Sequence, residues 1–281
     1  MDLVDTDCVD SDLQRTKNGE NKNVAFEKMV NCVADNFLDD LRDRKYYADT
    51  YKCWPPPIFI ISVTLIQLLY FIHFLCFDSD EMTTMSSVLS NDLFIYRPDK
   101  RQEFWRFAFY MVLHTGWTHL LFNIITQLLI GLPLEMVHGS TRIGTIYMAG
   151  ILAGSLGTSV FDSDVYLVGA SGGVYALLAA HIANVILNNK EMKLGFLRVC
   201  GILLIASFDV GFAVYERYSV KEESVQTSYV AHFTGALAGL TIGLIVLKNF
   251  EQKLHEQFIW WLALTGYIIC MAFAIIYNVL H

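Results

Sequence analysis

The sequence predicts an all-α polytopic membrane protein, and three observations carry that prediction. Hydrophobic residues make up 54% of the 281 residues and charged residues only 17%, whereas a soluble domain usually carries about 25% charged residues. The hydrophobic residues gather in blocks that approach the ~20 residues a helix needs to cross a bilayer. Ionisable residues are rare inside these blocks. No basic patch indicates a nucleic-acid partner, so the lipid bilayer is the expected environment.

Seven blocks are expected to be transmembrane helices. They cover residues 58–77, 119–136, 145–160, 168–187, 196–215, 229–247 and 258–280. A loop from about residue 78 to residue 116 separates the first two, and connections of this length are often functional.

The segment before the first block is polar. Residues 1–49 hold twelve acidic and seven basic residues, so most of the net charge of −8 lies there. Residues 1–23 have the composition of a disordered segment. Residues 24–41 carry apolar side chains at helical spacing, which predicts an amphipathic helix.

Lysine and arginine near the ends of the blocks predict the orientation. With the N-terminus in the cytoplasm, ten such residues lie on the inner side and six on the outer side. We therefore expect a cytoplasmic N-terminus and, after seven spans, a lumenal C-terminus.

Polar residues inside membrane spans are costly and are by default candidates for function. Spans two, four and six run in the same direction, so their N-terminal ends share one face of the membrane. Four of the polar residues lie close to those ends: His119, Asn123, Ser171 and His232. They are expected at similar, shallow depth below the outer surface.

Stripes of small residues predict which helices touch. Gly235, Gly239 and Gly243 follow His232 along span six, and a stripe of Gly172, Ala176 and Ala180 runs along span four. Small residues at this spacing let membrane helices approach closely. Contact between the two stripes would place Ser171 beside His232.

A serine beside a histidine is a candidate nucleophile with its general base. The free N–H groups at a helix start, together with His119 and Asn123, could stabilise an oxyanion. Taken singly, a serine before a helix is usually an N-cap, and a histidine in a membrane helix is often a packing residue. The coincidence of four such groups at one depth favours catalysis.

The other polar residues have simpler interpretations. Glu135 and His138 have the spacing of a metal-binding pair, but the pair occurs once and at the opposite face, so no metal or other cofactor is expected. Glu135 is expected to satisfy backbone or loop groups near the inner face. His181 is interpreted as internal packing and Asp209 as a hydrogen-bonding residue inside the bundle.

Four motifs resemble the rhomboid intramembrane serine proteases. They are EFWRF at 103–107, HTGWTHLLFN at 114–123, GASGGVYALLAAH at 169–181 and AHFTGALAGLTIG at 231–243. The resemblance extends over most of residues 59–280. It implies a leader over 1–54, a six-span catalytic core over 55–250 and a seventh transmembrane helix over 251–281.

The resemblance also implies roles for individual residues. Ser171 would be the nucleophile and His232 its base, in a dyad without a third carboxylate, while His119 and Asn123 complete the oxyanion site. The supporting positions that match the family are Gly169, Tyr175, His114, Trp105, Arg106 and Glu135.

A seventh span after a six-span core is similar to the animal secretase-type rhomboids, and the tail is most like insect members. The resemblance implies cleavage of type I single-span precursors of EGF-like growth factors in the secretory pathway, with the Golgi membrane as the expected location.

Two other functional classes compete with this one. A catalytically inactive rhomboid relative that binds clients usually lacks the serine or the histidine, and this chain has both. A transporter or channel would show charges at the midplane or matching broken helices in its two halves. The polar cluster here is shallow, and the halves do not mirror each other.

Overall fold

A computed structural model of the chain describes residues 56–77, 92–188, 195–219, 228–247 and 258–280, together with Lys28, Val30 and Asn31. Contacts divide the chain into two units, Met1–Tyr51 and Lys52–His281. The predicted helix over 24–41 falls almost entirely outside the described residues. Within that range only Lys28, Val30 and Asn31 are described, and all three are helical. The predicted domain boundaries near 54 and 250 also fall outside them. All of the predicted site residues belong to the second unit.

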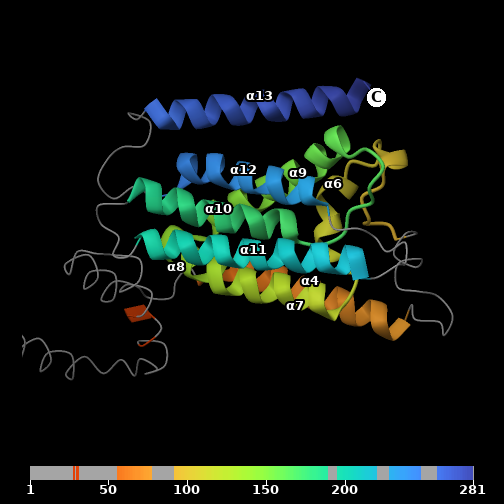
Figure 1. Cartoon of the computed structure of the whole chain (residues 1–281), viewed down its shortest axis with the longest axis horizontal. Helices are drawn as coiled ribbons and strands as arrows, with labels where there is room; N and C mark the ends of the chain where they lie inside the picture. The colour runs from red at the N-terminus through yellow and green to blue at the C-terminus, as the bar shows by residue number, and fades with distance from the viewer. Residues whose placement is uncertain are drawn as a thin grey trace, which may run out of the picture. The chain divides into compact units, whose positions relative to one another are not determined.

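The described part of this unit consists of helices joined by non-helical connections, and one isolated bridge pairs Tyr96 with Leu167. The long helices are α4 (Ile58–Phe77), α9 (Ser140–Phe161), α10 (Ser171–Leu187), α11 (Gly195–Ser219), α12 (Tyr229–Val246) and α13 (Phe258–Leu280). The second span is built from α7 (Trp117–Thr126), the π-helical turn η3 (Gln127–Gly131) and α8 (Leu132–His138). Short turns η1 (Pro98–Lys100), α6 (Arg106–Phe109) and η2 (Tyr110–Val112) precede it. Figure 1 shows the arrangement.

Six of the described helical segments are long and apolar enough to cross a membrane, and α10 is a shorter apolar helix. The predicted span over 168–187 therefore begins too early. Leu167 is held in extended backbone by its pairing with Tyr96, and Gly169 has a φ of +106°. Only at Ser171 does the chain become helical, which leaves 17 residues for α10.

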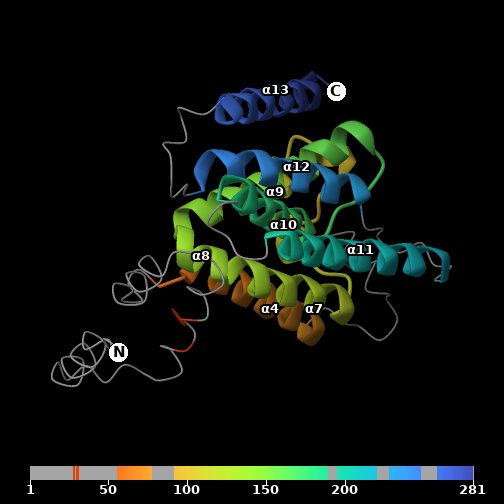
Figure 2. The same ribbon diagram turned by 60° about the vertical axis from the view of Figure 1, so that its left-hand side comes forward.

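A carboxylate joins the ends of three spans. Glu135 on α8 accepts hydrogen bonds from the backbone N–H groups of Phe59 at 2.7 Å and Ile60 at 2.9 Å, and from the hydroxyl of Ser140. A negative charge at a helix N-terminus satisfies free N–H groups and suits the helix dipole. Figure 2 shows the start of α4 beside α8. Gly139, with a φ of +91°, makes the sharp turn from α8 into α9.

The backbones of α10 and α12 lie in close contact, as the small-residue stripes predict. A Cβ atom on Gly235 would lie 2.4 Å from the carbonyl oxygen of Gly172, and one on Gly239 would lie 2.2 Å from that of Ala176. The same stretch of α10 also touches α9, where a Cβ on Gly150 would lie 2.3 Å from the Cβ of Ala176. The predicted contact between spans four and six is confirmed.

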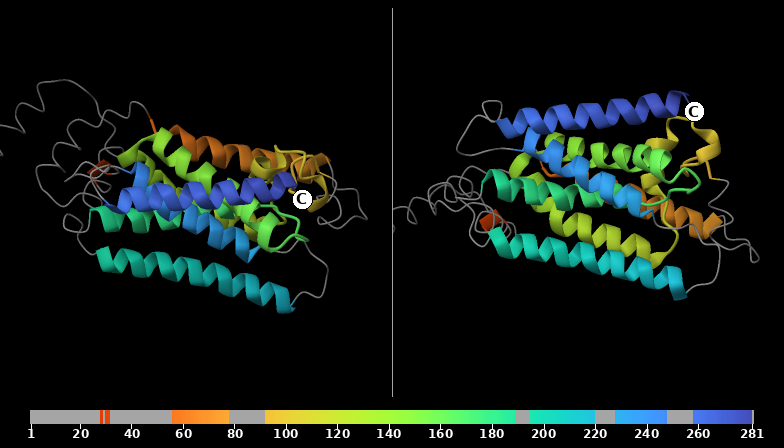
Figure 3. Two further views of the ribbon diagram at one scale, coloured as in Figure 1. Left: turned by 90° about the horizontal axis from the view of Figure 1, so that it is seen from above. Right: turned by 45° about the horizontal axis from the view of Figure 1, so that its top comes forward.

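The helix α11 is the least enclosed of the spans next to α10. Only 11% of its apolar window is buried, and Figure 3 shows it at the outer edge of the helices. It meets α7 through the stacked rings of Phe122 and Phe208 and meets α10 through a hydrogen bond between Tyr175 and Asp209. The Tyr175 hydroxyl also lies within hydrogen-bonding distance of the carbonyl oxygen of Ala206 at 3.4 Å, so both of its polar contacts help to hold α11 to α10.

Replacing Gly239 by alanine tests the α10–α12 contact. Since the added methyl group would meet backbone atoms of Ala176, Gly239→Ala should destabilise the protein by roughly 1–3 kcal/mol, as overpacking does. Gly201→Ala on α11 is the matched control because nothing lies within 4 Å of its Cβ position. Thermal unfolding of the purified protein in detergent measures both. Equal stability of the two variants would contradict the close backbone contact.

Candidate active site

Ser171 is the first residue of α10, and backbone hydrogen bonds hold the residues that precede it. Leu167 exchanges two backbone hydrogen bonds of 3.2 Å with Tyr96, and the N–H of Gly169 donates to the carbonyl oxygen of Tyr110 at 3.1 Å. The positive φ of Gly169 favours glycine, because other residues rarely adopt it. Ser171 itself is half-buried at the start of the helix. Its position is therefore set by backbone contacts with the segment around Tyr96 and Tyr110.

His232 lies in the first turn of α12 and is buried. Ser228 caps this helix by accepting a hydrogen bond from the N–H of Ala231 at 3.2 Å. The imidazole stacks on the ring of Tyr175, with centroids 4.3 Å apart and planes 13° apart. Among the described residues, neither ring nitrogen has a hydrogen-bond partner.

The helices that carry Ser171 and His232 touch close to both residues. Tyr175, on which His232 stacks, lies one helical turn after Ser171 on the same face of α10. Gly172, next to Ser171, touches Gly235, which lies one turn after His232. The serine makes no hydrogen bond to the imidazole in this structure. In enzymes without substrate, such bonds are often long and tighten only in the complex.

A carboxylate lies near the Nδ1 edge of the imidazole. Asp209 Oδ2 on α11 accepts a hydrogen bond from the Tyr175 hydroxyl at 2.9 Å and lies 3.7 Å from Nδ1 of His232. The sequence identified Asp209 only as a hydrogen-bonding residue of the bundle, and its proximity to His232 was missed. The available signal was the presence of an acid in an apolar span, which is expensive and therefore a candidate for function.

His119 and Asn123, both on α7, lie beside the entry to α10. The Nε2–Cε1 edge of His119 faces Gly169, since a Cβ on that glycine would lie 2.6 Å from Nε2. The Thr115 hydroxyl and Nδ1 of His119 are within hydrogen-bonding distance at 3.2 Å. Asn123 is buried and donates from Nδ2 to the carbonyl oxygen of His119 at 2.8 Å. Its Oδ1 has no partner among the described residues.

His114 packs against His119. Its ring is buried and meets the ring of His119 edge-on, with centroids 5.1 Å apart. Burial, with His119 as a second cause, lowers the pKa of His114 well below its ordinary value of 6.5. The imidazole is therefore neutral at physiological pH.

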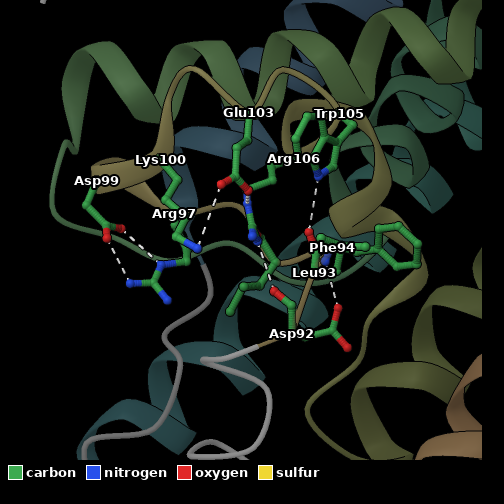
Figure 4. Close-up of polar contacts among 10 residues, drawn as sticks. Asp92, Leu93, Phe94, Arg97, Asp99, Lys100, Glu103, Trp105 and Arg106 are labelled. Atoms are coloured by element: carbon green, nitrogen blue, oxygen red, sulfur yellow. Dashed lines mark hydrogen bonds and ion pairs between the residues drawn. The ribbon is translucent and has the colours of Figure 1, made fainter.

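Trp105 and Arg106 lie in the folded loop before α7, where they contact other residues of that loop (Figure 4). The guanidinium of Arg106 donates to the carbonyl oxygens of Asp92 at 2.9 Å and Ile95 at 2.8 Å, and it pairs with Glu103. The indole of Trp105 donates to the carbonyl oxygen of Leu93 at 3.4 Å. These bonds hold the segment that ends in Tyr96, which in turn pairs with Leu167 before Ser171.

The structure thus separates the predicted residues into four groups. Ser171, His232 and Tyr175 lie near the contact between α10 and α12, where His232 stacks on Tyr175. Gly169, His119, Asn123 and His114 lie beside the start of α10. Trp105 and Arg106 organise the loop, while Glu135 lies at the far end of the second span. Asp209 is the one addition that the geometry makes to the first group.

Comparison with known proteins decides the family. The profile of the Rhomboid domain matches residues 101–249, which include Ser171, His232 and both α7 residues. The chain belongs to the rhomboid family. It is a multi-pass membrane protein, as its apolar helices indicate.

Relatives match over most of the chain. Rhomboid-related protein 3 of Homo sapiens is 40% identical over 264 residues, which is 90% of this chain and 64% of the relative. Rhomboid-related protein 2 of Mus musculus is 41% identical over 240 residues, or 84% of this chain and 79% of the relative. The chain therefore spans somewhat less than two thirds of the length of the human relative.

The rhomboid family contains both proteases and inactive members. Rhomboid protease GluP of Bacillus subtilis is 29% identical over 69% of this chain and 37% of its own length. Inactive rhomboid-related protein 2 of Caenorhabditis elegans is 31% identical over 80% of this chain and 65% of its own length. Membership alone therefore leaves both an active protease and an inactive relative open.

The buried state of His114 predicts a pH-dependent stability. Its folded pKa is depressed, so below an unfolded pKa of about 6.5 only the unfolded state takes up the proton, and stability falls as the pH drops further. Stability should therefore fall between pH 7.5 and pH 5.5. Thermal unfolding of wild type and His114→Asn at both pH values measures the difference. A loss of the same size in both proteins would show that His114 is not its source.

Proposed function

We propose that this rhomboid is an intramembrane serine protease. The observation that carries the proposal is a buried imidazole without a hydrogen-bond partner among the described residues. It stacks on Tyr175, which lies one helical turn after a serine at a helix start. A buried polar group without a partner is costly, and a proton-transfer role would explain why this one persists. The chain retains both the serine and the histidine, which favours the protease over the inactive client-binding relative.

The reaction follows from the roles of these groups. Ser171 Oγ attacks the carbonyl carbon of the scissile peptide bond while His232 takes the hydroxyl proton. Collapse of the tetrahedral intermediate breaks the C–N bond, and the imidazolium returns the proton to the leaving amine. Water then hydrolyses the acyl-enzyme by the same steps in the second half of the reaction. No cofactor is needed for either half.

The negative oxygen of the intermediate is stabilised by donors around Gly169. If the Thr115 hydroxyl donates to Nδ1 of His119, a neutral ring carries its proton on Nε2, the nitrogen that faces Gly169. Asn123 has a second amide N–H besides the one it gives to the carbonyl of His119. The N-terminal N–H groups of α10 add a third source of positive potential.

The proposed substrates are type I single-span membrane proteins, in particular precursors of EGF-like growth factors whose ectodomains are released. This assignment comes from the resemblance to secretase-type rhomboids, as does the proposed Golgi location with a cytoplasmic N-terminus. A helical peptide carbonyl is shielded by its own hydrogen bonds, so cleavage should favour substrate spans with helix-breaking residues near the outer end.

A shedding assay tests the protease assignment. Cells co-express the chain with an EGF-like growth factor precursor, and soluble ectodomain is measured in the medium for wild type, Ser171→Ala and His232→Ala at matched expression. Release by wild type alone is expected, because Ser171→Ala removes the proposed nucleophile and His232→Ala removes its base. Release by all three would favour the client-binding alternative. Release by none would overturn the growth-factor assignment.

Asn123→Ala tests the proposed oxyanion site. Loss of one donor should lower kcat by about 10²–10³-fold with a smaller change in KM, because the donor acts on charge that develops only in the transition state. Ile125→Ala is the matched control, since this side chain on the same helix is 60% exposed. Initial rates of substrate cleavage in proteoliposomes measure both. An unchanged kcat in Asn123→Ala would remove Asn123 from the site.

A further inference from the structure

Asp209 is an ionisable group in a place where such groups are rare. It is the one acidic residue in the apolar stretch Gly195–Phe212 of α11. Its side chain is only 17% exposed and points to α10 and α12 rather than to lipid. Keeping a carboxylate there is expensive, so its contacts should account for it.

The contacts of Asp209 converge on His232. A single oxygen, Oδ2, accepts the hydrogen bond of the Tyr175 hydroxyl at 2.9 Å and lies 3.7 Å from Nδ1 of His232. The ring of Tyr175 stacks on the imidazole at 4.3 Å. Tyrosine therefore fixes both the plane of the imidazole and the position of the carboxylate at its edge.

We propose that Asp209 is a positioning residue for His232, an inference that rests on the proposed protease function. With the carboxylate near Nδ1, the neutral imidazole carries its proton there, and the lone pair of Nε2 is left for the serine. The two ring nitrogens are distinct, and a partner at one selects the role of the other. The proposed dyad thereby gains a third member, with Asp209 acting on Ser171 through His232.

The same charge acts during the reaction. When Ser171 Oγ bonds to the substrate carbon, its proton moves to Nε2 and His232 becomes an imidazolium. Asp209 stays ionised and neither gains nor loses a proton, so the positive ring forms beside a fixed negative charge. At low local dielectric such a pair is stabilised far more than in water. The proton then leaves on the amine, and the neutral ring is restored.

A purely structural role must be distinguished from this one, because the bond between Asp209 and Tyr175 also ties α11 to α10. Two variants separate the roles. Asp209→Asn keeps an oxygen that can accept from Tyr175 but removes the charge. Tyr175→Phe removes that hydrogen bond but keeps the stacked ring and the carboxylate. The titratable groups acting on His232 among the described residues are Asp209 of α11, His119 of α7 and the hydroxyl of Tyr175 on α10.

The experiment measures the rate at which a fluorophosphonate labels the full-length protein in liposomes from pH 5 to pH 9. Wild type should be labelled and Ser171→Ala should not. In the plot of labelling rate against pH, Asp209→Asn should reach a plateau about tenfold lower than wild type. The fall in its rate at acidic pH, the acidic limb of the plot, should move to lower pH by about one unit, the size of effect that an opposite charge within ~4–6 Å has on proton binding. The limb moves this way because an imidazolium without the neighbouring carboxylate loses its proton more easily.

The controls make each outcome decisive. Asp209→Glu should restore most of the rate, and Tyr175→Phe should keep the acidic limb at the wild-type pH whatever its plateau rate. A wild-type pH profile in Asp209→Asn, or the same profile shift in Tyr175→Phe, would overturn the positioning role while leaving the protease intact. Absence of Ser171 labelling in wild type would instead overturn the proposed function, and the inference with it.

Discussion

The close approach of the α10 and α12 backbones is the constraint on which the rest of the site depends. In a bilayer, helices gain little from the hydrophobic effect by associating, so contact relies on packing at short range. Glycine supplies that range here, because a Cβ at Gly235 or Gly239 would lie within 2.4 Å of a backbone oxygen of α10. The distance between Ser171 and His232 is thus fixed by the main chain of two helices. Side-chain rotamers only refine it.

Several buried polar groups away from this contact form hydrogen bonds that hold the helices together. Glu135 caps α4, and Gln127 donates to Thr64 at 2.7 Å and to Gln67 at 2.9 Å between the first and second spans. The ring nitrogens of His232 and the Oδ1 of Asn123 are buried without partners among the described residues, as are both ring nitrogens of His114. Local departures of this kind are expected where a protein carries out chemistry.

Much of this was predictable from the sequence, because the signals were local or periodic. The apolar blocks predicted the helices, and the glycine stripe of span six predicted the α10–α12 contact through its spacing of three to four residues. The start of α10 was predicted too early, since the pairing of Leu167 with Tyr96 joins segments far apart in the chain. Asp209 could not be placed beside His232 either. That proximity depends on the rotation of α11 about its own axis, and one acid in an apolar helix does not determine it.

The most direct measurement is an experimental structure of the protein after reaction with a fluorophosphonate. The account predicts phosphorus bonded to Ser171 Oγ, its non-bridging oxygen directed toward His119 and Asn123, and Nε2 of His232 within hydrogen-bonding distance of the ester oxygen. Such a structure would show nucleophile, base and oxyanion donors acting on one centre. An unmodified Ser171, or an adduct with His232 out of reach, would contradict the account.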